Sequence, residues 1–218
     1  MPLRPSLYDF FNGEAELKEI IQKSDLPTLD FIPESPELDK LDMKLFLEAG
    51  REYQFTKKLL PELEEYDVII FDHAPSTHMC AQNGLIASDV VIVPLACEVT
   101  ANQAVETNLE TLTNMLELSH AEIPIIMVPT RLNTTAISQS IYGKYLNNFE
   151  PDIVPIPIRE FSKGEEAILN KESYIEYAPS SALAQEFYRL MIDLWERITY
   201  IVSPENAIRA AKIHEETV

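Results

Sequence analysis

Residues 66–76 have the sequence Tyr-Asp-Val-Ile-Ile-Phe-Asp-His-Ala-Pro-Ser, and this stretch decides the fold class. The run from Asp67 to Phe71 is apolar and rich in β-branched residues, which predicts a buried strand, and Pro75 breaks the pattern soon afterwards. Asp72 then lies at the C-terminal tip of that strand. Parallel α/β sheets bind ligands at this edge, and nucleotide hydrolases place there the aspartate that holds a magnesium-bound water. A plain core strand, with Asp72 capping the next turn, explains the same residues.

Outward from this stretch, apolar runs alternate with segments of helical periodicity. Short strands are predicted over residues 29–32, 89–93, 123–128 and 153–158, and helices over 7–22, 36–65, 100–118, 134–148, 162–170 and 180–200. Pro61 is expected to kink or restart the second helical segment, and Ser180 or Ser181 to cap the last one. This alternation predicts a three-layer α/β fold, with a mostly parallel sheet and helices on both faces. At 218 residues, one domain over 1–218 is expected.

The composition is that of a globular protein, except for its charge. Seventeen Lys and Arg face 36 Asp and Glu, giving a net charge of −19, which opposes broad contact with nucleic-acid phosphates. Cys80 and Cys97 show neither metal-ligand spacing nor a disulfide framework and are expected to be buried thiols. The N-terminus shows no basic region followed by an apolar run, and every apolar run is far shorter than a membrane span. A cytoplasmic protein without membrane contact is expected.

A series of motifs follows the first strand in a specific order. They are Asp67 and Asp72, Pro75-Ser76, Asn83, Ala87-Ser88-Asp89, Val90–Pro94, Thr130–Asn133, Pro157-Ile158-Arg159, Glu166-Ala167 and Tyr177–Ala182. Over roughly two thirds of the chain, this order resembles the ParA/MinD (Soj-like) family of partition P-loop ATPases. Leu7–Phe11, Phe31–Ser35 and Arg51-Glu52 fit the same family more loosely.

The resemblance implies a set of functional residues. Asp72 would take the Walker B role and hold Mg²⁺ indirectly, through water. The residues expected at the nucleotide are Asp72 and Pro75, then Thr130 and Arg131 in one loop beside the base, and Pro157, Ile158 and Arg159 in a second. ATP and Mg²⁺ are the implied cofactors. A ParB-like protein and a second copy of the chain are the implied partners.

The glycines depart from this family. Gly13, Gly50, Gly84, Gly143 and Gly164 are the five present, and none precedes a Lys-Ser or Lys-Thr pair at Walker A spacing. We therefore expect the chain to lack the P-loop β-α-β unit and to leave strand edges unpaired. A truncated or mis-started partition ATPase, one part of a split enzyme, and a stand-alone pseudo-ATPase each explain this departure. The leading hypothesis is a ParA-like partition or cargo-positioning protein, an ATP-dependent switch by resemblance that does not hydrolyse ATP alone, so enzymatic activity stays open.

Two other classes of function remain. One is a non-catalytic interaction module whose acidic helical faces bind a basic protein partner; Asp72→Ala would then be nearly silent, whereas it would matter in an ATPase. The other is a metal-dependent hydrolase built on Asp72, His73 and His78, with Glu98 as the nearest further ligand.

Overall fold

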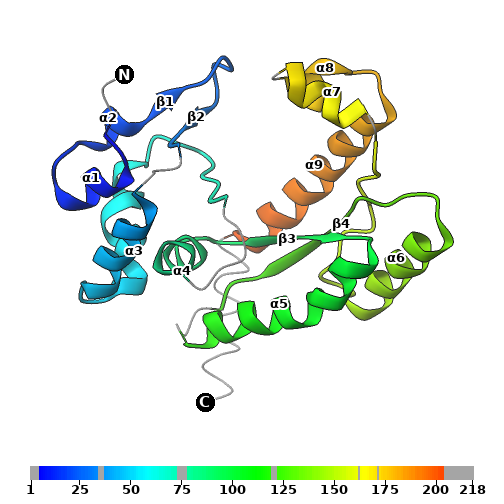
Figure 1. The fold of residues 1–218 in the computed structure, drawn as a ribbon, viewed down its shortest axis with the longest axis horizontal. Helices are drawn as coiled ribbons and strands as arrows, with labels where there is room; N and C mark the ends of the chain where they lie inside the picture. The colour runs from blue at the N-terminus through cyan, green and yellow to red at the C-terminus, as the bar shows by residue number, and fades with distance from the viewer. Residues whose placement is uncertain are drawn as a thin grey trace. The chain divides into compact units, whose positions relative to one another are not determined.

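The computed structural model describes residues 5–33, 37–72, 78–118, 122–161, 163–170 and 172–203. The chain divides into two compact units, which Figure 1 draws along one colour ramp. Unit 1 comprises Met1–Ser88 with Met115–Ala121, and unit 2 comprises Asp89–Asn114 with Glu122–Val218. Each unit has its own hydrophobic core, so each is described by itself.

Unit 1 is mainly helical. Its elements are α1 (Leu7–Asn12), α2 (Leu17–Ile20), the antiparallel strands β1 (Gln22–Lys23) and β2 (Asp30–Phe31), α3 (Leu38–Leu47), the 3-10 turns η1 (Arg51–Tyr53) and η3 (Leu60–Glu62), the π-helix η2 (Phe55–Leu59) and α4 (Met79–Ile86). Leu41 and Leu45 of α3 are completely buried at the centre of its core.

Two glycines divide the helices predicted for this unit. Gly13, at φ 75°, ends α1 in the left-handed conformation that glycine adopts at least cost, so the helix predicted over 7–22 becomes two short ones. Gly50, at φ 62°, separates α3 from the turns that follow. Pro61 lies in the first turn of η3, and the predicted restart is therefore confirmed.

The prediction of a strand over residues 67–71 is wrong. Within the described chain this segment has no ladder partner and is not a strand. Tyr66 and Phe71 pack against the core of unit 1, whereas Val68 and Ile70 are 55% and 81% exposed. An apolar, β-branched run favours a strand only where another strand lies alongside to accept its backbone hydrogen bonds. Asp72 is consequently an exposed residue after a segment without regular secondary structure, not the tip of a strand.

Unit 2 has the predicted three layers. Strands β3 (Val91–Ala96) and β4 (Ile125–Thr130) pair in parallel, from Val91 opposite Ile125 to Ala96 opposite Thr130. Helices α5 (Val99–Leu118, in this unit as far as Asn114) and α6 (Ala136–Asn148) cover one face, and α9 (Ala182–Ile201) covers the other (Figure 1). Helices α7 (Lys163–Asn170) and α8 (Tyr174–Tyr177) precede α9.

Strand β4 shows how its sequence builds these layers. Met127 packs towards α6, while Ile126 and Val128 pack towards α9, because successive side chains of a strand point to opposite faces. The last predicted strand, over 153–158, makes only isolated bridges, from Ile153 to Met127 and from Arg159 to Leu132. Pro155 and Pro157 lack the N–H groups that a continuous ladder needs.

Helix α9 follows its sequence pattern closely. The Ser181 hydroxyl accepts a hydrogen bond from the Ala184 N–H, so the predicted cap is Ser181. Leu183, Phe187, Leu190, Leu194 and Ile198 pack on the sheet as predicted. In the part of the chain that the structure describes, no helix is both long and apolar enough to cross a membrane.

Candidate functional site

Two loops meet at the C-terminal end of β4 in unit 2. The Ile158 N–H donates to the Pro129 carbonyl over 2.9 Å, and the Leu132 N–H to the Ile158 carbonyl over 3.3 Å. The Glu160 N–H returns a bond to the Leu132 carbonyl over 2.9 Å. Residues 129–133 and 157–160 therefore form one hydrogen-bonded loop pair, at the sheet edge where parallel α/β folds bind ligands.

Arg131 has a left-handed backbone and two ion pairs. Its φ of 55° is unusual for a residue with a side chain and is held by its surroundings. Its Nε lies 3.0 Å from Glu98 Oε1, and one terminal nitrogen lies 3.7 Å from Glu160 Oε1. Arg131 thus ties the end of β3 to both loops.

Arg159 is held from the opposite side of the sheet. Glu186, on α9, accepts a hydrogen bond from the Arg159 backbone N–H at 3.0 Å. The same carboxylate forms an ion pair with the Arg159 guanidinium. The Glu186 side chain is 8% exposed and that of Arg159 is 55% exposed, so the carboxylate is buried while the guanidinium reaches solvent. A buried carboxylate needs such a partner, which means that Glu186 fixes the conformation of the second loop.

The predicted site residues divide between the two units. Thr130 ends β4, Pro157 is half-buried and Ile158 is 9% exposed, so both predicted base-side loops come together in unit 2. Asp72 belongs to unit 1 and is exposed. Pro75 and His73 lie outside the described residues.

Three carboxylates, Glu98, Glu160 and Glu186, hold the two arginines, and this role was not predicted from the sequence. The sequence patterns predicted Glu98 only as a possible metal ligand, and they predicted no role for Glu160 or Glu186. One signal was available for Glu186, which lies three residues after Leu183 and four before Leu190, on the apolar face of α9. A carboxylate in that position implies a cationic partner.

The described residues fit one side of a nucleotide better than the other. The loop pair presents backbone groups, a half-buried proline and two arginines, which suit a planar base. Among these residues no group of three His, Cys, Asp or Glu is placed to hold a metal ion. Phosphate binding needs a cradle of backbone N–H groups with a lysine, and the described loops supply no such glycine-rich turn.

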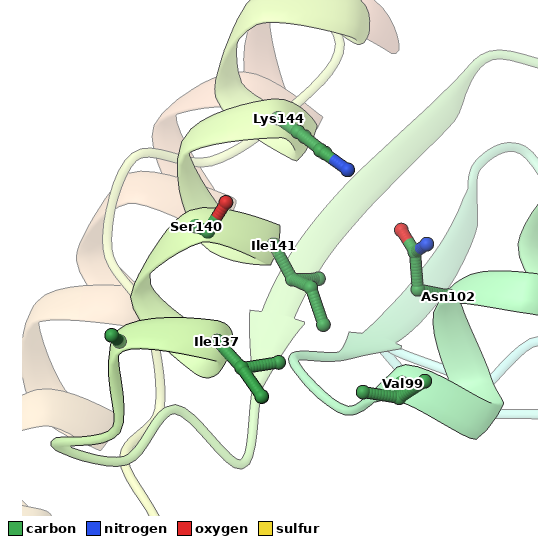
Figure 2. A pocket seen from close by; sticks show the side chains of 7 residues that line it. Val99, Asn102, Ile137, Ser140, Ile141 and Lys144 are labelled. Atoms are coloured by element: carbon green, nitrogen blue, oxygen red, sulfur yellow. The ribbon is translucent and has the colours of Figure 1, made fainter.

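A shallow groove of about 340 Å³ opens nearby, between the start of α5 and α6. Figure 2 shows the side chains of Val99, Ile137 and Ile141 converging on it, with the Lys144 amine at one end. Asn102, Ser140 and Ala136 complete the lining. These seven residues include no carboxylate, imidazole or thiol, so the groove is a binding surface without acid–base groups of its own.

The two thiols are poor nucleophiles. Burial raises the pKa of Cys97 to about 11, against a weaker opposing effect from a hydrogen bond to the Thr130 backbone. Burial, and then the charge of Asp42, raises the pKa of Cys80 to about 12. Both thiols stay protonated near neutral pH; Cys97 is buried as predicted, whereas Cys80 is half-buried.

Comparisons with known proteins point in one direction. A family model described as "AAA domain" matches residues 2–125. The cell division protein PomZ of Myxococcus xanthus is 26% identical over 195 residues, covering 88% of this chain and 61% of PomZ. The chromosome partitioning protein ParA of Caulobacter vibrioides is 32% identical over 111 residues, covering 50% of this chain and 42% of ParA. The chain thus spans less than two thirds of the length of these curated relatives.

Solved structures share the fold. The cobyrinic acid a,c-diamide synthase of Mycobacterium smegmatis, crystallised with an ATP analog and magnesium, superposes with a TM-score of 0.64 and is 27% identical. The match covers 76% of this chain and 68% of the synthase. An α/β fold of the nucleotide-binding type is therefore shared with proteins of known structure.

Proposed function

Because the chain belongs to the AAA-domain family of ParA/MinD-type proteins, we propose that it acts in partition or in the positioning of a cargo. The relatives support this role through their own names, which are a cell division protein and a chromosome partitioning protein. A ParB-like protein is the proposed partner, because proteins of this family work with a second protein that controls their nucleotide cycle.

The observation that carries a nucleotide-linked role is the loop pair of unit 2. Residues 129–133 and 157–160 lie far apart in sequence, yet three backbone hydrogen bonds join them. We propose that Thr130, Arg131, Pro157, Ile158 and Arg159 flank the base of ATP. Asp72 is the proposed holder of the Mg²⁺-bound water, as its place in the family motif implies.

Hydrolysis is a separate question. The 218 residues contain no glycine-rich turn followed by Lys-Ser or Lys-Thr. Phosphoryl transfer depends on backbone and lysine contacts to the β- and γ-phosphates. We therefore propose that this polypeptide does not hydrolyse ATP by itself, and that it forms an active switch only when a phosphate loop is supplied.

Calorimetry and a hydrolysis assay test this proposal together. Mg-ATP titrated into the 218-residue chain should give no saturable heat and no phosphate release. A fusion that places a P-loop β-α-β segment from a ParA relative ahead of residue 1 should bind Mg-ATP. In that fusion Asp72→Ala should abolish hydrolysis, whereas Asp67→Ala, an exposed carboxylate five residues earlier, should leave it unchanged. Equal effects of the two substitutions on hydrolysis would show that Asp72 is not part of the nucleotide site. Saturable binding of Mg-ATP by the 218-residue chain alone would show that no added phosphate loop is needed.

A non-catalytic module that binds a basic protein is the second candidate. It is favoured by the net charge of −19 and by the row of exposed carboxylates along α5, at Glu106, Glu110 and Glu117. A module of this kind would bind its partner equally well with Asp72→Ala and more weakly as salt is raised. A switch would instead require Mg-ATP for partner binding, and that requirement separates the two candidates.

A further inference from the structure

Helix α9 has a second apolar face, directed away from the sheet. Its inner face, with Leu183, Leu190 and Leu194, is used by the core of unit 2. The outer face of α9 is formed by six residues: Gln185, Tyr188, Ile192, Trp195, Thr199 and Val202. Tyr188, Ile192, Trp195 and Val202 are 42%, 55%, 56% and 47% exposed. These four apolar side chains are not needed to cover the sheet.

The spacing of the outer face is that of a helix-pairing seam. Its six positions are separated alternately by three and four residues, which is the heptad a/d pattern of coiled coils. Tyrosine and tryptophan at its centre are the residue types that dominate the energy of protein interfaces. An aromatic row of this kind on a helix that already packs its other side indicates a partner.

We propose that the outer face of α9 pairs with the same face of a second copy of this chain, with the two helices antiparallel. A two-fold axis midway between Asp193 and Leu194 brings Ile192 opposite the partner's Trp195. The next layer sets Tyr188 against the partner's Thr199, and the outermost layer sets Gln185 against the partner's Val202. Each layer occurs twice by symmetry, as an isologous interface requires.

The charges beside the seam favour this partner over others. Arg189 and Glu196 lie on the same flank, one on each side of the centre, and both are exposed. In the antiparallel arrangement Arg189 faces the partner's Glu196, and the symmetry repeats the pair. Neither side chain makes an ion pair with another described residue of its own chain. A face with one cation and one anion on opposite sides of its centre is complementary to itself and not to a uniformly basic or acidic partner.

The length of the face sets the expected strength. From Gln185 to Val202 the helix rises about 26 Å, which is two and a half heptads. Two such faces bury on the order of 1,000 Å², at the lower end of specific interfaces. We therefore expect a reversible dimer that forms at micromolar concentrations and does not require nucleotide.

Sedimentation velocity on the full chain, without nucleotide, tests the proposal. Between about 1 and 100 µM, the range in which interfaces of this size associate, the mass should rise from 24.8 kDa towards twice that value. Arg189→Glu and Glu196→Arg should each raise the dimer Kd at least tenfold, because each creates two like-charge contacts. An equimolar mixture of the two variants should recover the wild-type Kd, since every flanking contact is again between opposite charges. Only an antiparallel pairing in this register predicts that recovery.

Two matched variants control for charge alone. Lys58→Glu and Glu106→Arg reproduce the charge changes at exposed positions outside helix α9 and should leave the Kd unchanged. A wild-type chain that stays monomeric at 100 µM overturns the proposal. So does a dimer that ignores the substitutions at 189 and 196, because it must use another surface. Weakened variants that do not recover on mixing overturn the antiparallel register, provided that circular dichroism shows them folded.

Discussion

Asn83 is a single residue on which much of unit 1 depends. It is completely buried, and its amide nitrogen donates to the carbonyls of Arg51 at 2.7 Å and Met79 at 2.9 Å. Its oxygen accepts the Phe55 N–H at 3.0 Å. One side chain thus satisfies the backbone of both η1 and η2 from helix α4.

Asn83→Ala should therefore destabilise the chain strongly. The substitution leaves one buried backbone N–H and two carbonyls without their partner, which costs about 2–4 kcal/mol in the free energy of unfolding. Urea denaturation followed by circular dichroism measures the change. Asn108→Ala, on the exposed side of α5, is the control and should change the free energy by less than about 0.5 kcal/mol. Similar effects of the two substitutions would show that the Asn83 bonds contribute nothing net.

The cysteines give a pH-dependent prediction at the same scale. Burial favours the neutral thiol, so the thiolate of Cys97, with a pKa of about 11 instead of 9, is about 100-fold rarer in the folded than in the unfolded chain at pH 8. Because the unfolded thiols lose their protons first as pH rises from about 9 to 11, stability should fall over that range. Alkylation by iodoacetamide at pH 8 should be at least tenfold slower in the folded chain than in urea. Equal rates in both states would contradict the burial of Cys97 and the partial burial of Cys80.

The arginines show what a sequence can and cannot say about single residues. The resemblance to the family predicted that Arg131 and Arg159 lie in two loops beside the base, and the structure brings those two loops together. The left-handed backbone of Arg131 and its two carboxylate partners could not be predicted, because they depend on contacts with residues 29 and 33 positions away in the chain. Local patterns indicate where a loop starts, whereas tertiary contacts decide its conformation.

At the scale of elements, two similar apolar runs reach different outcomes. The segment 91–96 becomes β3, while the segment 67–71, equally rich in valine and isoleucine, forms no strand in the described chain. The difference lies in the partner, because β3 has β4 in register over six residue pairs. A sequence pattern reports apolar character and period, but it does not report whether a neighbouring strand is present. For the same reason the helices of unit 2, which make their hydrogen bonds internally, were predicted more accurately than its strands.

Hydrogen exchange tests this difference between elements. The amides of Val68, Ile69 and Ile70 should exchange almost as fast as in an unfolded peptide, because the described chain holds them in no ladder. The amides of Ile126, Met127 and Val128 should be protected by several orders of magnitude, since β4 is paired and buried. The two segments have similar composition, which makes β4 an internal control. Comparable protection of both would mean that residues 67–71 pair with a strand after all.

At the scale of the whole molecule, charge governs which partners the chain meets. Net charge is −19, and most lysines and arginines that the structure describes lie within 4.0 Å of a carboxylate. Binding to duplex DNA gains its free energy from cations that displace condensed counterions from phosphates. A lysine or arginine that is paired with a carboxylate has little net charge, so it releases few counterions from the DNA phosphates. We therefore expect the described residues to contribute little non-specific affinity for DNA.

Fluorescence anisotropy with a labelled 30-base-pair duplex measures this directly. In about 50 mM salt, where electrostatic binding is strongest in such assays, the chain should show no saturable binding up to roughly 50 µM. Removing carboxylates that hold arginines gives the sharper comparison. Glu98→Gln with Glu160→Gln changes the net charge by +2 and releases Arg131, whereas Glu106→Gln with Glu110→Gln changes it equally without releasing a described arginine. If pairing is what silences the cations, only the first pair of substitutions should produce measurable, salt-sensitive binding. Equal gains in affinity for both double variants would mean that net charge alone sets the affinity for DNA. Saturable binding by the wild-type chain would mean that a cationic surface binds DNA despite the negative net charge and the ion pairs.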